Sequence, residues 1–173
     1  ILSAINVGAI GNLNELESLC DLSVRALDEI IELQDYPVKA AEVSTKSRRS
    51  LGIGYIGLAH YLAKNGVKYS DPKAWELVDR LSEAFQYYLL RASCDIAQEK
   101  GKCEAFERTK YADGLLPIDH YKKEVDEIVP HKQRMAWESL RKDIGKYGLR
   151  HSTLSAQMPS ESSSVVSNAT NGI

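Results

Sequence analysis

A run of serines beside a proline is the part of the sequence best suited to chemistry. Residues 159–164 read Pro-Ser-Glu-Ser-Ser-Ser, between a strand-like segment and Val165-Val166, where we expect a helix to begin. Backbone N–H groups at a helix start lack intrahelical partners, and the helix dipole adds about half a positive charge there. Small serine side chains let a phosphate approach and add hydroxyl donors. The pattern favours an anion site, with a solvated helix-capping loop as the alternative.

Three glycines form a second candidate motif. Gly52, Gly54 and Gly57 satisfy G-x-G-x-x-G. A dinucleotide site needs a buried strand before this motif, a helix after it and an acidic residue about 20 positions further on. Residues 44–50 are polar and basic, and Asp71 is better placed to cap the next helix. We therefore interpret the glycines as positions of close packing, with dinucleotide binding as the weaker alternative.

The cysteines do not have the spacing of a metal or redox site. No C-x-x-C or H-E-x-x-H spacing occurs in the chain, and metal sites depend on such clusters. Cys20 and Cys94 fall within predicted helices, where cysteine is usually a small core residue. We therefore expect no metal bound by this chain.

The histidines and a pair of arginines are the other candidate groups. The histidines are scattered, with His60 expected on a helix and His120 and His131 at the surface. Arg48-Arg49 follows Lys46, and it could contact a carboxylate or a phosphate. We interpret this stretch as a solvated basic turn.

Helices supply most of the framework that must position these groups. Apolar residues recur at helical spacing over about 14–33, 72–100 and 133–146, and a shorter helix around 59–63 ends at Asn65-Gly66. Asp71-Pro72 is a strong start for the longest of them. We expect a loop anchored by Phe106 over 102–117 and a short helix over 117–128. Strand-like residues occupy about 2–8, 50–55 and 149–158.

Composition excludes several classes of protein. The 173 residues are 43% hydrophobic and 27% charged, which excludes a disordered or collagen-like chain. The net charge of −2 gives no support for binding to nucleic acid or to an anionic membrane. Apolar runs are far shorter than the ~20 residues of a membrane-spanning helix. Three cysteines favour a reducing compartment, and we expect the cytoplasm. The start lacks the basic segment of a signal peptide, and both ends look cut from something longer.

Several segments together resemble the large (α) subunit of class I ribonucleotide reductase, in its bacterial and phage form. The most specific segment is 148–163, Gly-Leu-Arg-His-Ser-Thr-Leu-Ser-Ala-Gln-Met-Pro-Ser-Glu-Ser-Ser, which continues into the matching 167–173. Shorter matching segments are 6–10, 48–54, 61–66, 86–90 and 116–119. The resemblance implies part of a ten-stranded α/β barrel, here mainly helical with a few short strands. Residues 1–173 would be a single segment of the catalytic barrel domain, truncated at both ends.

The resemblance also implies a reaction and a substrate site. The family reduces ribonucleoside diphosphates to deoxyribonucleoside diphosphates by radical chemistry, for DNA precursor synthesis. Its Pro-Ser-Glu-Ser/Thr-Ser loop holds the substrate diphosphate, and the matching residues are Pro159, Ser160, Glu161, Ser162 and Ser163. This agrees with the anion site predicted from the residues alone. A carboxylate repels a phosphate, so we expect the Glu161 side chain to turn away.

The family's catalytic cysteines and radical-relay tyrosines have no counterparts within these residues. One redox cysteine would stand immediately before Ile1, and Cys20, Cys94 and Cys103 match no catalytic position. The resemblance therefore implies an inactive fragment, with no catalytic residue and no cofactor of its own. The whole enzyme would need a metal-containing, radical-generating small (β) subunit and a thiol reductant.

The expected partners are the substrate, the rest of the large subunit and the small subunit, with no nucleic acid and no membrane. Two alternatives stay open. One is a non-catalytic helical module that binds a partner protein, and the other is a stand-alone nucleotide-phosphate-binding domain.

Overall fold

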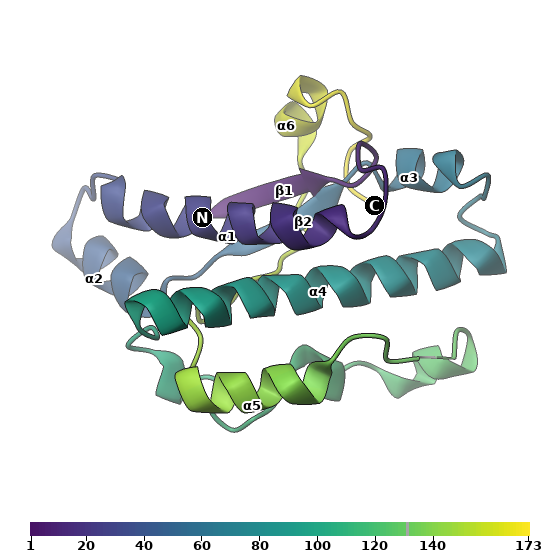
Figure 1. Cartoon of the computed structure of the whole chain (residues 1–173). Coiled ribbons are helices and arrows are strands. Elements are labelled where there is room, and N and C mark those ends of the chain that lie inside the picture. Colours follow the sequence, from purple (N-terminus) through teal and green to yellow (C-terminus); the bar gives the residue numbers. More distant parts are fainter. Residues whose placement is uncertain (131) are drawn as a thin grey trace.

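The computed structural model of the chain describes residues 1–130 and 132–173, and His131 lies outside the described residues. Helices of all kinds account for 54% of the chain, which confirms the expected helical majority. Helix α4 (Pro72–Lys100) lies between α1 (Glu15–Leu33) and α5 (Trp137–Tyr147) (Figure 1). A small sheet packs on this helical layer, where the ring of Tyr55 meets the edge of Phe85 at 5.4 Å between centroids.

Helix α1 follows the predicted apolar spacing. Its buried side chains recur every three or four residues: Leu16, Cys20, Val24, Leu27, Asp28 and Ile31. The helix ends at Leu33, shortly before Pro37, which cannot continue a helix because it lacks an N–H. The predicted range of about 14–33 is confirmed.

Helix α4 has the bounds that the sequence predicts. Pro72 occupies its first turn, and Gly101, with φ of 86°, ends it in a conformation that glycine adopts without strain. Leu81, Phe85 and Leu89 are buried as expected. Trp75 lies on the same helix but is 39% exposed, whereas the neighbouring Ala74 is buried, so the Trp75 side of the first turn is not covered by the core.

Two short parallel strands form the sheet. Strand β1 (Leu2–Asn6) pairs with β2 (Gly52–Ile56), with Leu2 opposite Gly52 and Asn6 opposite Ile56. Strand β1 lies within the predicted 2–8, and β2 overlaps the predicted 50–55 but ends one residue later. All five residues of β2 are buried, as expected for a strand covered on both faces.

The prediction of a third strand at 149–158 is wrong. The structure has a single parallel bridge in this region. Residues 153–156 run parallel to β2, with Ile53 opposite Ser155. The Ile53 N–H donates to the Leu154 carbonyl at 2.8 Å, and the Ala156 N–H donates to the Ile53 carbonyl at 3.2 Å. After Ala156 the backbone turns away from β2, so the ladder is too short to count as a strand.

Helix α2 (Lys39–Arg48) was not predicted, and the expected basic turn at 46–49 is wrong. None of its residues is buried, so it has no apolar face that periodicity would reveal. Residues 46–48 complete its last turn, and Arg49 follows in the left-handed conformation with φ of 48°.

The other helices differ from expectation mainly at their bounds. Helix α3 (Leu58–Lys64) confirms the predicted helix near 59–63. Helix α5 begins at Trp137, four residues later than predicted. The expected helix at 117–128 is instead two 3₁₀ turns, η2 (Pro117–Asp119) and η3 (Lys123–Glu127). The 102–117 loop contains one 3₁₀ turn, η1 (Phe106–Arg108), and Phe106 is buried as predicted.

The last helix begins earlier than the sequence suggested. Helix α6 covers Glu161–Val166, whereas we expected a loop up to Ser164 and a helix from Val165. The Ser160 carbonyl accepts the first helical hydrogen bond, from the Ser164 N–H at 2.7 Å. The Ser164 hydroxyl donates back to the Glu161 carbonyl at 2.7 Å, so this serine is accommodated inside the helix by a local hydrogen bond.

Arg49 is buried in an ionic cluster rather than solvated. Its side chain is 4% exposed, and its Nε donates to Asp28 Oδ1 at 2.7 Å. A second contact joins Arg49 to Glu32. His151, fully buried, lies within 3.2 Å of the same Asp28 oxygen through Nε2 and within 2.9 Å of the Ser93 hydroxyl through Nδ1. The cluster therefore joins α1, α4, the end of α2 and the 148–152 segment.

Candidate functional site

Residues 159–163 lie where the third parallel segment leaves the sheet. β1, β2 and residues 153–156 run in the same direction, so their carboxyl ends meet at one edge. Helix α6 follows that edge and projects from the rest of the molecule (Figure 1). Ligand sites of parallel α/β folds form at the carboxyl ends of the strands.

The backbone N–H groups of the first turn of α6 are the main donors here. Ser160 donates its N–H to the Asn171 side-chain oxygen at 3.0 Å. Among the described residues, the N–H groups of Glu161, Ser162 and Ser163 have no hydrogen-bond acceptor. Three free donors on successive residues are what an anion needs at a helix start.

The side chains of the loop differ in how far they reach solvent. Pro159, Glu161, Ser162 and Ser163 are exposed, whereas Ser160 is 6% exposed. The Ser163 hydroxyl donates to the Ser160 carbonyl at 3.1 Å. The Ser162 hydroxyl has no hydrogen-bond partner among the described residues and is the freest side-chain donor of the loop.

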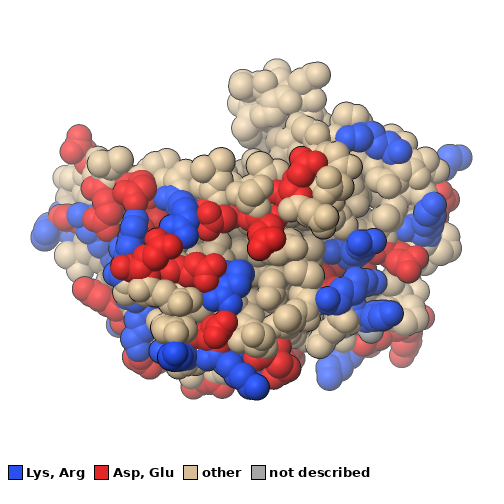
Figure 2. Space-filling model, viewed as in Figure 1, with Lys and Arg blue, Asp and Glu red and all other residues tan. Residues whose placement is uncertain are grey.

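Basic side chains do not contribute to this segment. Residues 157–173 contain Glu161 and no lysine or arginine. On the face shown in Figure 2, positive and negative side chains are mixed, and the visible side of the projection at α6 has no charged side chain. Attraction of an anion here therefore depends on backbone and hydroxyl donors.

The three glycines serve close packing, as interpreted from the sequence. A Cβ on Gly54 would lie 2.4 Å from the Ala156 carbonyl oxygen, so only glycine lets the third segment approach β2. Gly57 has φ of 80°, and its N–H donates to the Thr170 carbonyl at 2.9 Å. The glycines therefore position the segments before and after α6, and we assign them no dinucleotide.

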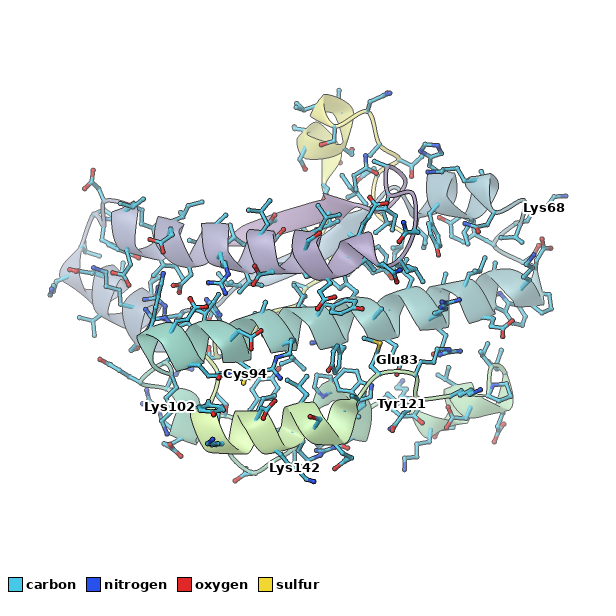
Figure 3. All side chains as sticks on the ribbon, viewed as in Figure 1. Lys68, Glu83, Cys94, Lys102, Tyr121 and Lys142 are labelled. Atoms are coloured by element: carbon cyan, nitrogen blue, oxygen red, sulfur yellow. The ribbon has the colours of Figure 1, made fainter. Side chains whose placement is uncertain are left out.

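The three cysteines are buried free thiols, and none lies at the candidate site. Burial raises the pKa of Cys20 to about 12 and that of Cys94 to about 11, so both stay protonated at neutral pH. Figure 3 shows Cys94 on the side of α4 that faces α5. They are core residues, as predicted for Cys20 and Cys94.

Two of the remaining histidines are at the surface. His60 lies on helix α3 and His120 is exposed after η2, as predicted for each, and His60 is exposed as well. The surface prediction for His131 falls outside the described residues. In the part of the chain that the structure describes, no group of three or more His, Cys, Asp or Glu could hold a metal ion. Within that same part, every helix is too short or too polar to cross a membrane.

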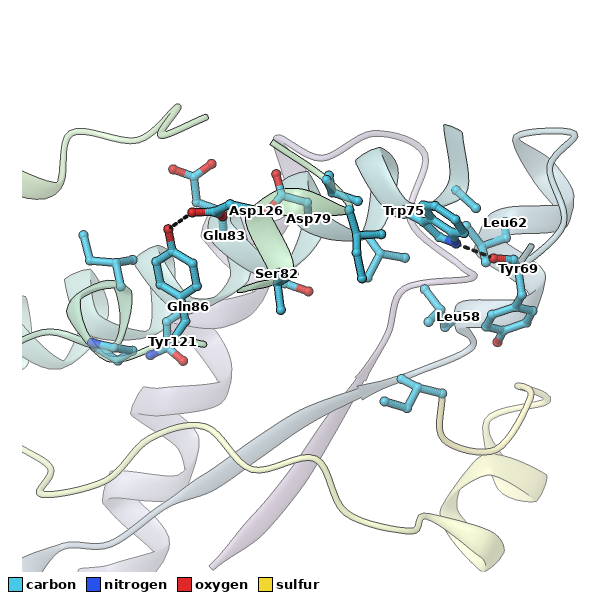
Figure 4. Close-up of a pocket in the computed structure, with 18 of the residues that line it drawn as sticks. Leu58, Leu62, Tyr69, Trp75, Asp79, Ser82, Glu83, Gln86, Tyr121 and Asp126 are labelled. Carbon is cyan, nitrogen blue, oxygen red and sulfur yellow. Dashed lines mark hydrogen bonds between the residues drawn. The ribbon is translucent and has the colours of Figure 1, made fainter. Parts of the chain in front are cut away.

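A large cavity lies elsewhere, between α4, α3 and the η2–η3 segment (Figure 4). It has a volume of about 1070 Å³, and its lining is mostly apolar, with Trp75 and Ile128 among the exposed members. Its buried carboxylate, Glu83, accepts the Trp137 indole N–H at 3.0 Å and the Arg134 N–H at 2.7 Å. Those contacts outweigh burial, which by itself would raise the pKa of Glu83, and lower it. Residues 159–163 are not part of its lining, so we place the candidate chemistry at the loop and not in this cavity.

The chain has clear relatives among known proteins. Residues 1–173 match the family model described as ribonucleotide reductase, barrel domain. The chain is 60% identical over 172 residues to the ribonucleoside-diphosphate reductase subunit alpha of Haemophilus influenzae, which covers 99% of this chain and 23% of that protein.

Identity is 56% over 143 residues with the ribonucleoside-diphosphate reductase 1 subunit alpha of Escherichia coli, covering 83% of this chain and 19% of that one. The alpha subunit of enterobacteria phage T4 is 45% identical over 159 residues, covering 92% and 21%. The chain thus spans about a fifth of the length of these relatives.

Proposed function

The chain belongs to the ribonucleotide reductase barrel-domain family, and on that basis we propose that it forms the diphosphate-binding part of a ribonucleoside-diphosphate reductase large subunit. Residues 159–163 bind the two phosphates of a ribonucleoside diphosphate. The observation that carries this proposal is the set of free N–H groups on Glu161, Ser162 and Ser163. They lie in the segment that matches the family's substrate loop.

The chemistry of this part is binding and orientation. Three backbone N–H groups donate to the negative phosphate oxygens without a counter-charge, and the Ser162 hydroxyl adds a fourth donor. Neutral donors hold a diphosphate less tightly than arginine would, which suits a site that must release its product. Glu161 is exposed, so its carboxylate faces solvent in this proposal and does not contact the phosphates.

The whole protein would reduce the ribose of its substrate by radical chemistry. In this proposal a metal-containing small subunit generates the radical, a thiol reductant restores the site, and the reaction takes place in the cytoplasm. The remaining parts of the large subunit supply the catalytic cysteines, because Cys20, Cys94 and Cys103 match no catalytic position of the family.

A chimera tests the proposal. Residues 1–173 replace the matching segment of the Haemophilus influenzae subunit, and inhibition by inorganic pyrophosphate is measured with the KM for a ribonucleoside diphosphate. Ser162→Ala removes one hydroxyl and should weaken binding about fivefold, as expected for one neutral hydrogen bond. Ser162→Pro removes a backbone donor while staying compatible with a first helical turn, and should weaken binding more.

Ser167→Ala is the control. Ser167 is exposed just after the carboxyl end of α6, and among the described residues only its backbone N–H and carbonyl form hydrogen bonds. It should leave both constants unchanged. If Ser162→Pro also leaves pyrophosphate inhibition unchanged, residues 159–163 are not the diphosphate site.

A further inference from the structure

We infer that two amide side chains, Gln157 and Asn171, are positioning residues that hold the 158–160 turn against the end of the sheet. This inference rests on the proposed diphosphate function of 159–163. Both residues lie outside that loop, one before it and one after it. Each makes its contact through a side-chain amide and a backbone group.

Gln157 takes the place of a strand residue. Its Nε2 donates to the Tyr55 carbonyl at 2.6 Å, and its Oε1 lies 3.5 Å from the Tyr55 nitrogen, whose N–H points to it. A primary amide carries the same donor and acceptor as a peptide group, so the side chain adds one more rung to the ladder with β2. The main chain is therefore free to leave the sheet at residue 158 without leaving Tyr55 unpaired.

Asn171 fixes the other end of the turn. Its Oδ1 accepts the Ser160 N–H at 3.0 Å, which would otherwise be a fourth free donor beside those of residues 161–163. The preceding Thr170 carbonyl accepts the Gly57 N–H at 2.9 Å. Residues 170–171 thus connect the start of α6 to the turn that follows β2.

The two contacts together orient the free donors. Gln157 attaches the entry of the turn to Tyr55, and Asn171 attaches its exit to the segment bound at Gly57. The N–H groups of 161–163 follow directly, within one helical turn. Loss of either amide should let the turn rotate away from the sheet, with little loss of core packing because both side chains are exposed.

The test uses ¹⁵N-labelled chain and substitutions that remove or keep each hydrogen bond. Asn171→Ala removes the acceptor and should speed hydrogen exchange of the Ser160 amide about fivefold, the size of one hydrogen bond. Asn171→Asp keeps the acceptor and should restore the protection of that amide. Gln157→Met keeps the side-chain length and should expose the Tyr55 amide in the same way. Thr170→Ala is the matched control, because it changes only an exposed side chain and keeps the carbonyl.

Inorganic pyrophosphate is the binding probe, monitored by amide shifts of residues 161–163. Asn171→Ala and Gln157→Met should each weaken binding about fivefold, with an unfolding temperature close to that of the unchanged chain. Normal binding by both variants, or unchanged Ser160 exchange in Asn171→Ala, would overturn the inference while leaving the proposed function intact. Absence of any pyrophosphate shift in the unchanged chain would instead contradict the proposed function, and the exchange rates alone would then decide whether the amides hold the turn.

Discussion

A single carboxylate organises the most buried polar contacts of the molecule. Asp28 is fully buried and meets Arg49, His151, Lys100 and Arg150. Burial by itself raises the pKa of Asp28, but the hydrogen bonds from His151 and Arg49 outweigh it and hold the pKa well below its usual range. Asp28 is therefore ionised at neutral pH, and its negative charge balances the cationic side chains around it.

Removing that charge should destabilise the fold strongly. Asp28→Asn removes the buried counter-charge of Arg49 and leaves only Glu32, which is 43% exposed. Breaking a buried ion pair from one side costs about 3–5 kcal/mol. Asp21→Asn on the same helix is the control, since Asp21 is 42% exposed and pairs with Arg25 at the surface. It should cost no more than about 1 kcal/mol. Urea unfolding of both variants measures the difference, and equal losses would contradict the role given to Asp28.

The same cluster predicts a loss of stability in mild acid. Burial lowers the pKa of His151 below its ordinary 6.5, although the hydrogen bond to Asp28 opposes this. The unfolded chain therefore takes up a proton at a higher pH than the folded chain. The contribution of neutral His151 to the free energy of unfolding is complete above about pH 6.5 and is lost as the pH falls below that value. Asp28 adds its own loss only below its ordinary 3.8.

Unfolding free energies measured between pH 7.5 and 5 should show this slope. His151→Gln should remove the slope in this window, whereas His60→Gln, which changes an exposed residue, should keep it. An unchanged slope in His151→Gln would assign the acid sensitivity to another group.

Among the elements, the approach of the third segment to β2 depends on a missing side chain. Gly54→Ala would place a Cβ 2.4 Å from the Ala156 backbone oxygen, which cannot rotate aside. We expect a loss of about 1–3 kcal/mol, the range for overpacking. Gly145→Ala in α5 has nothing within 4 Å and should stabilise the chain by about 0.5–1 kcal/mol. Thermal unfolding of the two variants should therefore shift in opposite directions.

Element bounds were predictable where a local signal marked them. Pro72 in the first turn and Gly101 with its positive φ mark the ends of α4, so its range follows from the sequence. The expected side-chain cap by Asp71 does not form, because its carboxylate accepts the Lys68 N–H instead. Helix α2 has no buried residue and hence no periodic face to detect. The bounds of the third segment depend on tertiary contacts, because the Gln157 side chain ends its ladder with β2.

The candidate site was predictable only in part. Ser-rich sequence before a helix indicates an anion site, and the family resemblance supplies its residues. The buried state of Ser160 and its bond to Asn171, eleven residues away, could not be read from spacing. Arg49 was mistaken for a solvated residue because its partners, Asp28 and Glu32, lie on another helix.

On the scale of the whole molecule, the chain offers hydrogen-bond donors for a phosphate at residues 161–163, whereas its three thiols are buried. Burial keeps Cys20 and Cys94 protonated, and none of the three cysteines lies at residues 159–163. We therefore expect the chain alone to form no deoxyribonucleotide, even with a small subunit and a thiol reductant supplied. A radiolabelled ribonucleoside diphosphate assay checks this, with the Haemophilus influenzae subunit as the positive control. Measurable turnover would mean that one of the buried thiols becomes reactive.

Asn171, whose side chain accepts the Ser160 N–H, is also a site for deamidation during storage. Asn171 is followed by Gly172, whose unhindered nitrogen can attack the asparagine side-chain carbonyl and expel ammonia; hydrolysis of the resulting ring leaves aspartate or isoaspartate. Asparagine is among the thermolabile residues, and Gly172 has open space around it. Each deamidated molecule gains a negative charge beside the free donors of α6. A sample stored at alkaline pH should therefore lose pyrophosphate affinity in step with the acidic species resolved by ion exchange, well before it unfolds.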